Sequence, residues 1–105
     1  MTDIQLVFVN CPSPEFATTL ARSLVEERLA ACGNILTGVR SIYHWEGALC
    51  EDQEATLLLK CRAEGFEALK ARIVSLHPYT LPEILAIPVV AGHLPYLAWV
   101  RAESE

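Results

Sequence analysis

The sequence predicts a single α+β domain, in which a four-stranded antiparallel sheet carries two main helices on one face and a short C-terminal helix follows. A length of 105 residues is that of one domain. The spacing of apolar residues changes between strand and helix periods in the order strand, helix, strand, strand, helix, strand. This order is the split βαβ pattern of ferredoxin-like sandwiches, so residues 1–105 are predicted to form one such domain.

The first strand and the first helix follow from local patterns near the N-terminus. Ile4 to Val9 is a nearly continuous apolar run, as expected of a strand in the middle of a sheet. Ser13 followed by Pro14 is a helix start, because the serine oxygen caps free amides and proline suits the first helical position. Apolar residues at helical spacing extend this helix to about Ala30.

A long hairpin is predicted next. Residues Val39 to Trp45 alternate in side-chain direction and carry apolar groups on both faces, so one face is expected to meet the core and the other a partner. Glu46-Gly47 begins a turn region, and Glu54 to Cys61 returns as the second strand of the hairpin.

The last third of the chain supplies a helix, a strand and a closing helix. Apolar residues from Phe66 to Leu76 form the second main helix, which His77-Pro78 ends, since a residue before proline avoids the helical region. The strand Glu83 to Val90 contains Pro88, which predicts an edge position or a bulge. Leu94 to Ala102 is predicted to be the short C-terminal helix. One helix layer leaves the opposite sheet face bare, and a 52% hydrophobic content predicts that other subunits cover it.

Charge and hydropathy exclude two classes of partner. The chain has 13 acidic and 8 basic residues, and the basic residues are scattered, which argues against nucleic-acid binding. No apolar stretch reaches the length of about 18 residues that a membrane-spanning helix needs. The N-terminus also lacks a basic region before its short apolar run, so no signal peptide or membrane partner is predicted and a cytoplasmic location is expected.

The common catalytic motifs are absent from the sequence. It contains no glycine-rich nucleotide loop, no His-Glu-x-x-His zinc motif and no nucleophile elbow. The four cysteines are widely spaced without a Cys-x-x-Cys pair, so they are expected to be thiols, more often buried than functional. We therefore expect a protein that is not an enzyme and uses no organic cofactor.

The segment His77–Glu83 is the best candidate for a metal site. Its two prolines make it rigid, and an imidazole with a carboxylate can bind Cu²⁺ or Zn²⁺. Extended chain between the two residues spans roughly 20 Å, whereas ligands of one metal lie within about 4 Å of each other. Either the loop folds back or co-ligands come from another segment or subunit; alternatively His77 only ends a helix and Glu83 pairs with a cation. Cys11, a second candidate, is either a soft copper ligand or a buried thiol.

Aromatic residues gather at the hairpin and in the C-terminal half of the chain. Aromatic side chains with polar tips line pockets and interfaces, although they also fill cores. A tryptophan beside a hairpin turn favours an interface, because such a turn is usually exposed to water. The residues concerned are Tyr43, Trp45, Tyr79, Tyr96 and Trp99.

Four segments together resemble the CutA family of divalent-cation tolerance proteins. They occur in the family's order, and the resemblance covers nearly the whole chain. The segments are Leu24–Cys32, Ser41–Gly47, His77–Glu83 and Tyr96–Val100.

The resemblance implies a ferredoxin-like homotrimer similar to the PII signalling proteins, which binds Cu²⁺ and other divalent ions. It also implies a functional cleft between subunits, with His77, Glu83 and Cys11 as metal-ligand candidates and Tyr43, Trp45, Tyr79 and Trp99 as walls. Cys11 is out of register with the copper-linked cysteine of some members, and His44 stands where the family often has another aromatic residue.

Two functions from different classes remain open on the sequence alone. The first is a non-enzymatic, trimeric divalent-metal-binding protein for copper tolerance. The second is a PII-like signalling or scaffold protein that binds a small molecule or a partner protein at the intersubunit cleft.

Overall fold

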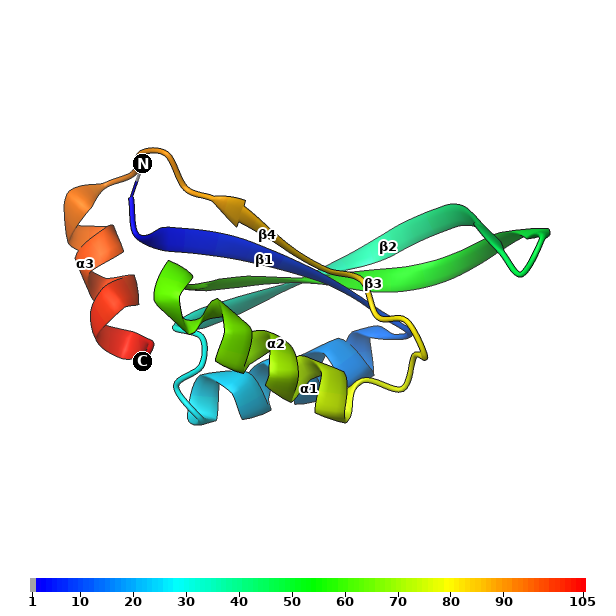
Figure 1. Ribbon diagram of the computed structural model, residues 1–105, viewed down its shortest axis with the longest axis horizontal. Helices are drawn as coiled ribbons and strands as arrows, with labels where there is room; N and C mark the ends of the chain where they lie inside the picture. The colour runs from blue at the N-terminus through cyan, green and yellow to red at the C-terminus, as the bar shows by residue number, and fades with distance from the viewer. Residues whose placement is uncertain (1) are drawn as a thin grey trace.

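The computed structural model describes residues 2–105 and confirms the α+β, ferredoxin-like architecture. The four strands form one antiparallel sheet in the order β2-β3-β1-β4, and α1 and α2 cover the same face of it (Figure 1). The elements are β1 (Ile4–Cys11), α1 (Pro14–Glu26), β2 (Cys32–Trp45), β3 (Ala48–Arg62), a 3₁₀ turn (Ala63–Gly65), α2 (Phe66–Leu76), β4 (Ile84–Pro88) and α3 (Leu94–Glu103).

The main core lies between the two central strands and the helices α1 and α2. On this face β1 and β3 pair Val7 with Leu59, Val9 with Leu57 and Cys11 with Ala55, and all six side chains are fully buried. The apolar stripe of α1 packs onto them through Ala17, Leu20, Ala21 and Leu24. The helix starts as the sequence predicts, since the Phe16 amide donates to the Ser13 hydroxyl at 3.1 Å.

The first helix and the hairpin have different limits from those predicted. Helix α1 ends at Glu26 rather than Ala30, because Arg28 adopts a positive φ of 61° and the Leu29 amide bonds back to the Leu24 carbonyl. Strand β2 begins at Cys32, well before Val39. A bulge between Leu36 and Val39 interrupts its alternation, which is why periodicity revealed only the second half of the strand.

The turn of the hairpin is also tighter than the sequence analysis expected. Glu46 and Gly47 have φ values of 50° and 81°, so two residues suffice to reverse the chain, and β3 begins at Ala48 rather than Glu54. The hairpin therefore extends well beyond the rest of the sheet (Figure 1), and the molecule measures 45 × 25 × 23 Å.

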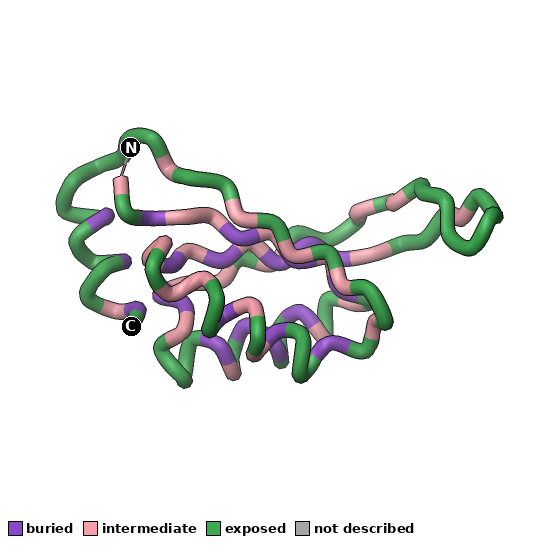
Figure 2. Tube along the Cα trace, in the orientation of Figure 1, coloured by how far each residue is buried: buried purple, intermediate pink, exposed green. Residues whose placement is uncertain are grey.

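The sheet face opposite the helices is open. Phe8 pairs with Leu58 on one side and with Leu85 on the other, so these three side chains lie on this face. Leu85 is 58% exposed, and Ile87 two residues on is 48% exposed; β4 is largely exposed along its length (Figure 2). As predicted from Pro88, β4 is an edge strand. We call this surface the open sheet face.

Helix α3 closes the end of the sheet that lies far from the hairpin turn (Figure 1). Its buried residues Leu97 and Val100 form a second apolar cluster with Ile4 and Ala31. Among residues 2–105, no helix is long and apolar enough to span a membrane.

Candidate functional site

A groove lies between the β2–β3 hairpin and the segment of residues 78–83 that follows α2. It consists of two adjoining hollows of about 320 and 470 Å³, which share Tyr43, Trp45 and Tyr79 as walls. Glu54 and Glu83 supply the carboxylates of its lining. We call it the hairpin groove; it has the size of a small-molecule site.

His77 fastens the segment 78–83 to the end of β1. Its Nε2–H donates to the Asn10 carbonyl at 2.7 Å, and its Nδ1 accepts the Tyr79 amide at 3.2 Å. Because a carbonyl can only accept and an amide N–H can only donate, these two bonds select the neutral tautomer that carries its proton on Nε2. The ring is buried and contacts Phe16 edge-on and Tyr79 at centroid distances of 5.2 and 4.6 Å.

Asn10 brings the predicted metal-ligand candidates to one end of β1. Its side-chain amide donates to Glu83 at 3.4 Å, while His77 bonds to its carbonyl and Cys11 follows it in the chain. The three side chains do not converge, however. Glu83 is exposed in the groove, His77 lies beneath Tyr79, and Cys11 points into the core. Within residues 2–105, no three His, Cys, Asp or Glu side chains are arranged to hold a metal ion.

Burial keeps the thiol of Cys11 protonated. Desolvation, reinforced by the negative charge of Glu54, raises the pKa of Cys11 to about 12. Desolvation alone raises the pKa of the fully buried Cys61 to about 11. A thiolate ligand at position 11 would therefore first have to lose a proton that the fold holds firmly.

We expect Cys11 and Cys61 to resist alkylation in the native protein, because reagents attack the accessible thiolate. Cys50, on the half-exposed hairpin, is the internal control. Treatment with iodoacetamide at mildly alkaline pH, followed by mass spectrometry of peptides, should show Cys11 and Cys61 reacting at least about a hundredfold more slowly than Cys50. Comparable rates for Cys11 and Cys50 would contradict the buried, protonated state.

Two tyrosines of the groove donate to carboxylates on β3. The Tyr79 hydroxyl donates to Glu54 at 2.7 Å, and the Tyr43 hydroxyl donates to Asp52. The hydrogen bond to Asp52 is the main cause that raises the pKa of Tyr43 to about 12. Burial, followed by the bond to Glu54, raises the pKa of Tyr79 further above its usual range. Both phenols are thus neutral and fixed in orientation at physiological pH.

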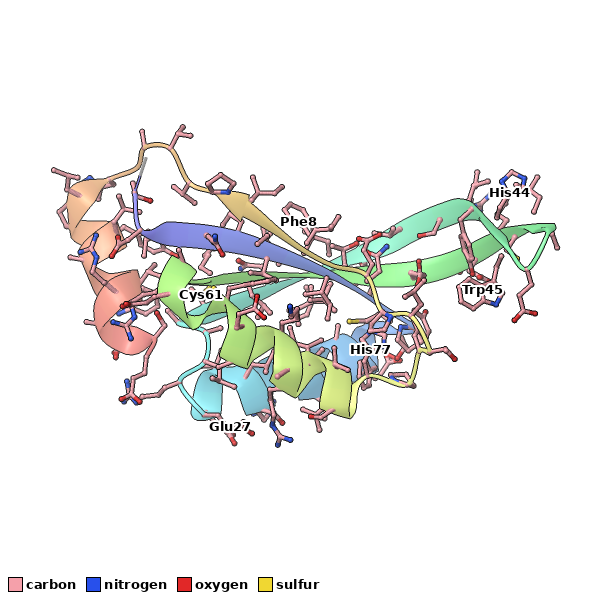
Figure 3. All side chains as sticks on the ribbon, viewed as in Figure 1. Phe8, Glu27, His44, Trp45, Cys61 and His77 are labelled. Carbon is pink, nitrogen blue, oxygen red and sulfur yellow. The ribbon has the colours of Figure 1, made fainter. Side chains whose placement is uncertain are left out.

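Sequence reasoning missed Asn10, Asp52 and Glu54. The strand alternation carried a usable signal, because Ser41 pairs with Asp52 and Val39 with Glu54, on the same side of the hairpin as Tyr43. Consecutive residues of the hairpin point to opposite sides, as His44 and Trp45 do in Figure 3. Asn10 gave no local signal, since its role depends on contacts with residues distant in the chain.

Trp99 does not lie with the other predicted walls of the cleft. It stands on α3 and stacks on Tyr96 at a centroid distance of 5.6 Å. Helix α3 and the hairpin turn are at opposite ends of the molecule (Figure 1). A single subunit therefore supplies only Tyr43, Trp45 and Tyr79 to the groove.

A four-stranded antiparallel sheet in the order β2-β3-β1-β4, with two helices on one face, places the chain in the class of ferredoxin-like α+β proteins. The chain belongs to the CutA family: residues 5–103 match the family described as CutA1 divalent ion tolerance protein. The resemblance found in the sequence is thereby confirmed.

Individual relatives agree with this assignment. The chain is 52% identical to the divalent-cation tolerance protein CutA of Thermus thermophilus, over 95% of this chain and 97% of the relative. It is 41% identical to the human Protein CutA over 97% of this chain, but spans only 57% of the human protein.

Solved structures extend the agreement to three dimensions. The divalent cation tolerance protein of Thermus thermophilus has a TM-score of 0.94 at 49% identity, covering 97% of this chain and 99% of that one. The PII-like protein CutA from Nostoc, in apo form, has a TM-score of 0.90 at 42% identity, covering 96% of this chain and 97% of that one.

Proposed function

We propose that this protein is a non-enzymatic homotrimer that binds divalent cations, Cu²⁺ in particular, and serves in cation tolerance. The binding of a divalent cation is supported by membership of a family that is described as divalent ion tolerance proteins. We propose Cu²⁺ in particular because an imidazole together with a carboxylate is a ligand set that suits this ion. A cytoplasmic location belongs to the same proposal, since all four cysteines are free thiols, as is usual in a reducing compartment.

The hydrogen bond from His77 to Asn10 is the observation that carries the metal proposal. Metal-binding histidines usually donate their second ring N–H to a carbonyl or carboxylate, which fixes the tautomer and frees the other nitrogen as ligand. In His77 that other nitrogen, Nδ1, is held only by the Tyr79 amide at 3.2 Å. A cation at Nδ1 would displace this one bond. Glu83, which does not converge on His77 within the single subunit, would have to turn from Asn10 toward His77 to become a second ligand.

Further ligands would come from a neighbouring subunit, which links the metal proposal to the homotrimer. The open sheet face supports association, because a single subunit leaves Leu85 and Ile87 exposed and Phe8 only half-buried. In a trimer, Trp99 would join the cleft from a second subunit. The proposal rests on His77 and Glu83 rather than Cys11, whose thiol remains protonated near neutral pH.

Calorimetric titration of the metal-free protein with Cu²⁺ tests the metal proposal. We expect sub-micromolar binding, weakened at least tenfold by Glu83→Gln and by His77→Ala, because each removes one proposed ligand. The His93→Ala variant is the matched control. It also removes an imidazole, but His93 is exposed and its side chain does not cap the N-terminus of α3.

The titration has a clear negative result. Weak Cu²⁺ binding that none of the three substitutions changes would make copper incidental to this protein. Light scattering on each variant must show an unchanged oligomer, so that loss of a ligand is not confused with loss of assembly.

A second candidate function is a PII-like signalling or scaffold role, in which the cleft binds a small molecule or a partner protein. The observation that favours it is the hairpin groove itself, which is larger than one ion requires and has three aromatic walls. In this role the trimer would present an occupied or empty cleft to another protein. Ligand binding that is lost in Trp45→Leu, which removes a groove wall but leaves His77 and Glu83 in place, would favour this candidate over metal capture.

A further inference from the structure

We infer that the hairpin groove binds a small organic cation, an alkylammonium ion of a few carbon atoms. The inference rests on the second candidate function, that the cleft binds a small molecule, and adds the chemical class of that molecule. Three features of the groove lead to it: the sign of its charge, the aromatic character of its walls, and a volume too large for a bare ion.

The charge of the groove is negative. Glu54 and Glu83 line it, and Asp52 lies directly behind, bonded to the hydroxyl of Tyr43. No lysine or arginine is among the lining residues, and His44 is the one imidazole there, so the two carboxylates face no permanent positive charge within the groove. Arg40, the only lysine or arginine of β2, instead pairs with Glu51 at 3.3 Å. An anionic ligand such as a nucleotide or a dicarboxylate would therefore be repelled.

The walls suit a cation with apolar substituents. Tyr43, Trp45 and Tyr79 surround the first hollow, and the first two are 39% and 41% exposed in the single subunit, so their own chain leaves these rings open to a ligand. Aromatic faces attract ammonium groups through the ring quadrupole, and aromatic cages for quaternary ammonium ions use this attraction. Because the hydroxyls of Tyr43 and Tyr79 already donate to carboxylates, the phenol rings are electron-rich and their orientation is fixed.

The size of the groove separates an organic cation from a metal ion. A divalent ion needs several ligand atoms within about 2.5 Å of one point, and no three His, Cys, Asp or Glu side chains of residues 2–105 provide such an arrangement. A hollow of about 320 Å³ with spread carboxylates and aromatic walls instead matches a molecule of several heavy atoms. The carboxylates would then balance the positive charge of the organic cation, and the aromatic rings would contact its methyl or methylene groups.

Titration calorimetry of the whole protein with three matched probes tests this inference. Choline is the cationic probe, 3,3-dimethyl-1-butanol is its neutral isostere, and succinate is an anionic probe. We expect submillimolar binding of choline, at least tenfold weaker binding of the alcohol, and no measurable binding of succinate. The difference between choline and the alcohol isolates the positive charge, because the two molecules have the same shape.

Variants locate the binding to the groove. Glu54→Gln keeps the size of the side chain and an oxygen for the Tyr79 hydroxyl, and it should weaken choline binding at least tenfold. Trp45→Leu should do the same by removing an aromatic wall. Glu51→Gln is the matched control, because this carboxylate is on the adjacent position of β3 to Asp52, points to the other side of the hairpin, and should leave binding unchanged.

Several outcomes would overturn the inference. Equal binding of choline and the alcohol would show that the positive charge does not matter. Equal effects of Glu54→Gln and Glu51→Gln would show that the ligand does not bind in the groove. Failure of choline with tight binding of succinate would refute the cation but leave a small-molecule role standing. Failure of both charged probes, with Cu²⁺ binding that depends on Glu83, would refute the inference and leave metal capture as the function.

Discussion

Replacing Leu85 with glutamate is expected to dissociate the protein into monomers. Leu85 is 58% exposed in the single subunit and pairs with Phe8 at the centre of the open sheet face. In an assembly that covers this face, each glutamate would have to be desolvated without a partner, at an effective penalty of several kcal/mol per ion. Light scattering or sedimentation should show the change from the proposed trimer to a monomer.

The same substitution should leave the single subunit folded, because its side chain meets water in the monomer and not the core. Far-ultraviolet circular dichroism should therefore retain the native signal. Val74→Glu is the matched control, since Val74 is 53% exposed but lies on α2, in the helix layer and away from the open sheet face. A Leu85→Glu variant that remains trimeric would show that subunits associate through another surface.

Replacing His77 with alanine is expected to lower the free energy of unfolding by about 2–4 kcal/mol. The substitution leaves the Asn10 carbonyl and the Tyr79 amide without their partners, and it removes the ring packed between Phe16 and Tyr79. Urea unfolding at a fixed protein concentration measures the loss, since the stability of an oligomer depends on concentration.

A local measurement separates this role of His77 from a general loss of stability. Hydrogen exchange should accelerate most in residues 78–83, because the imidazole is what fastens this segment to β1. His93→Ala, which removes an exposed imidazole, should change stability by no more than about 0.5 kcal/mol. If both variants lost the same stability, the two hydrogen bonds of His77 would carry no special weight.

These two substitutions also mark where prediction from sequence reached its limit at the site. The rigid segment from His77 to Glu83 and the aromatic residues Tyr43 and Trp45 were found from residue types and prolines. Which atoms of His77 are engaged was not accessible, because its partners are a backbone carbonyl far away in the chain and an amide two residues on. Likewise Glu54 belongs to the groove only because Tyr79 lies against it.

The sequence by itself determined the order of the elements and the start of α1 after Ser13, and it limited β4 to an edge position or a bulge, of which the structure shows the edge. Each of these follows from local chemistry: alternation and helical spacing of apolar groups, a capping hydroxyl, and a proline that lacks an N–H. Membership of the CutA family could also be predicted from the sequence, because the segments that resemble the family are short and contiguous.

Only the tertiary structure decided the early end of α1, the bulge that hides the first half of β2, and the burial of Cys11. The bulge depends on the register with β3, and the thiol is buried because Val9, Cys11 and Ala55 share the face that the helices cover. The hairpin groove was also decided by the tertiary structure, since it forms where a loop and a hairpin that are far apart in the chain meet. Such features depend on long-range contacts, whose energies no local pattern of residues encodes.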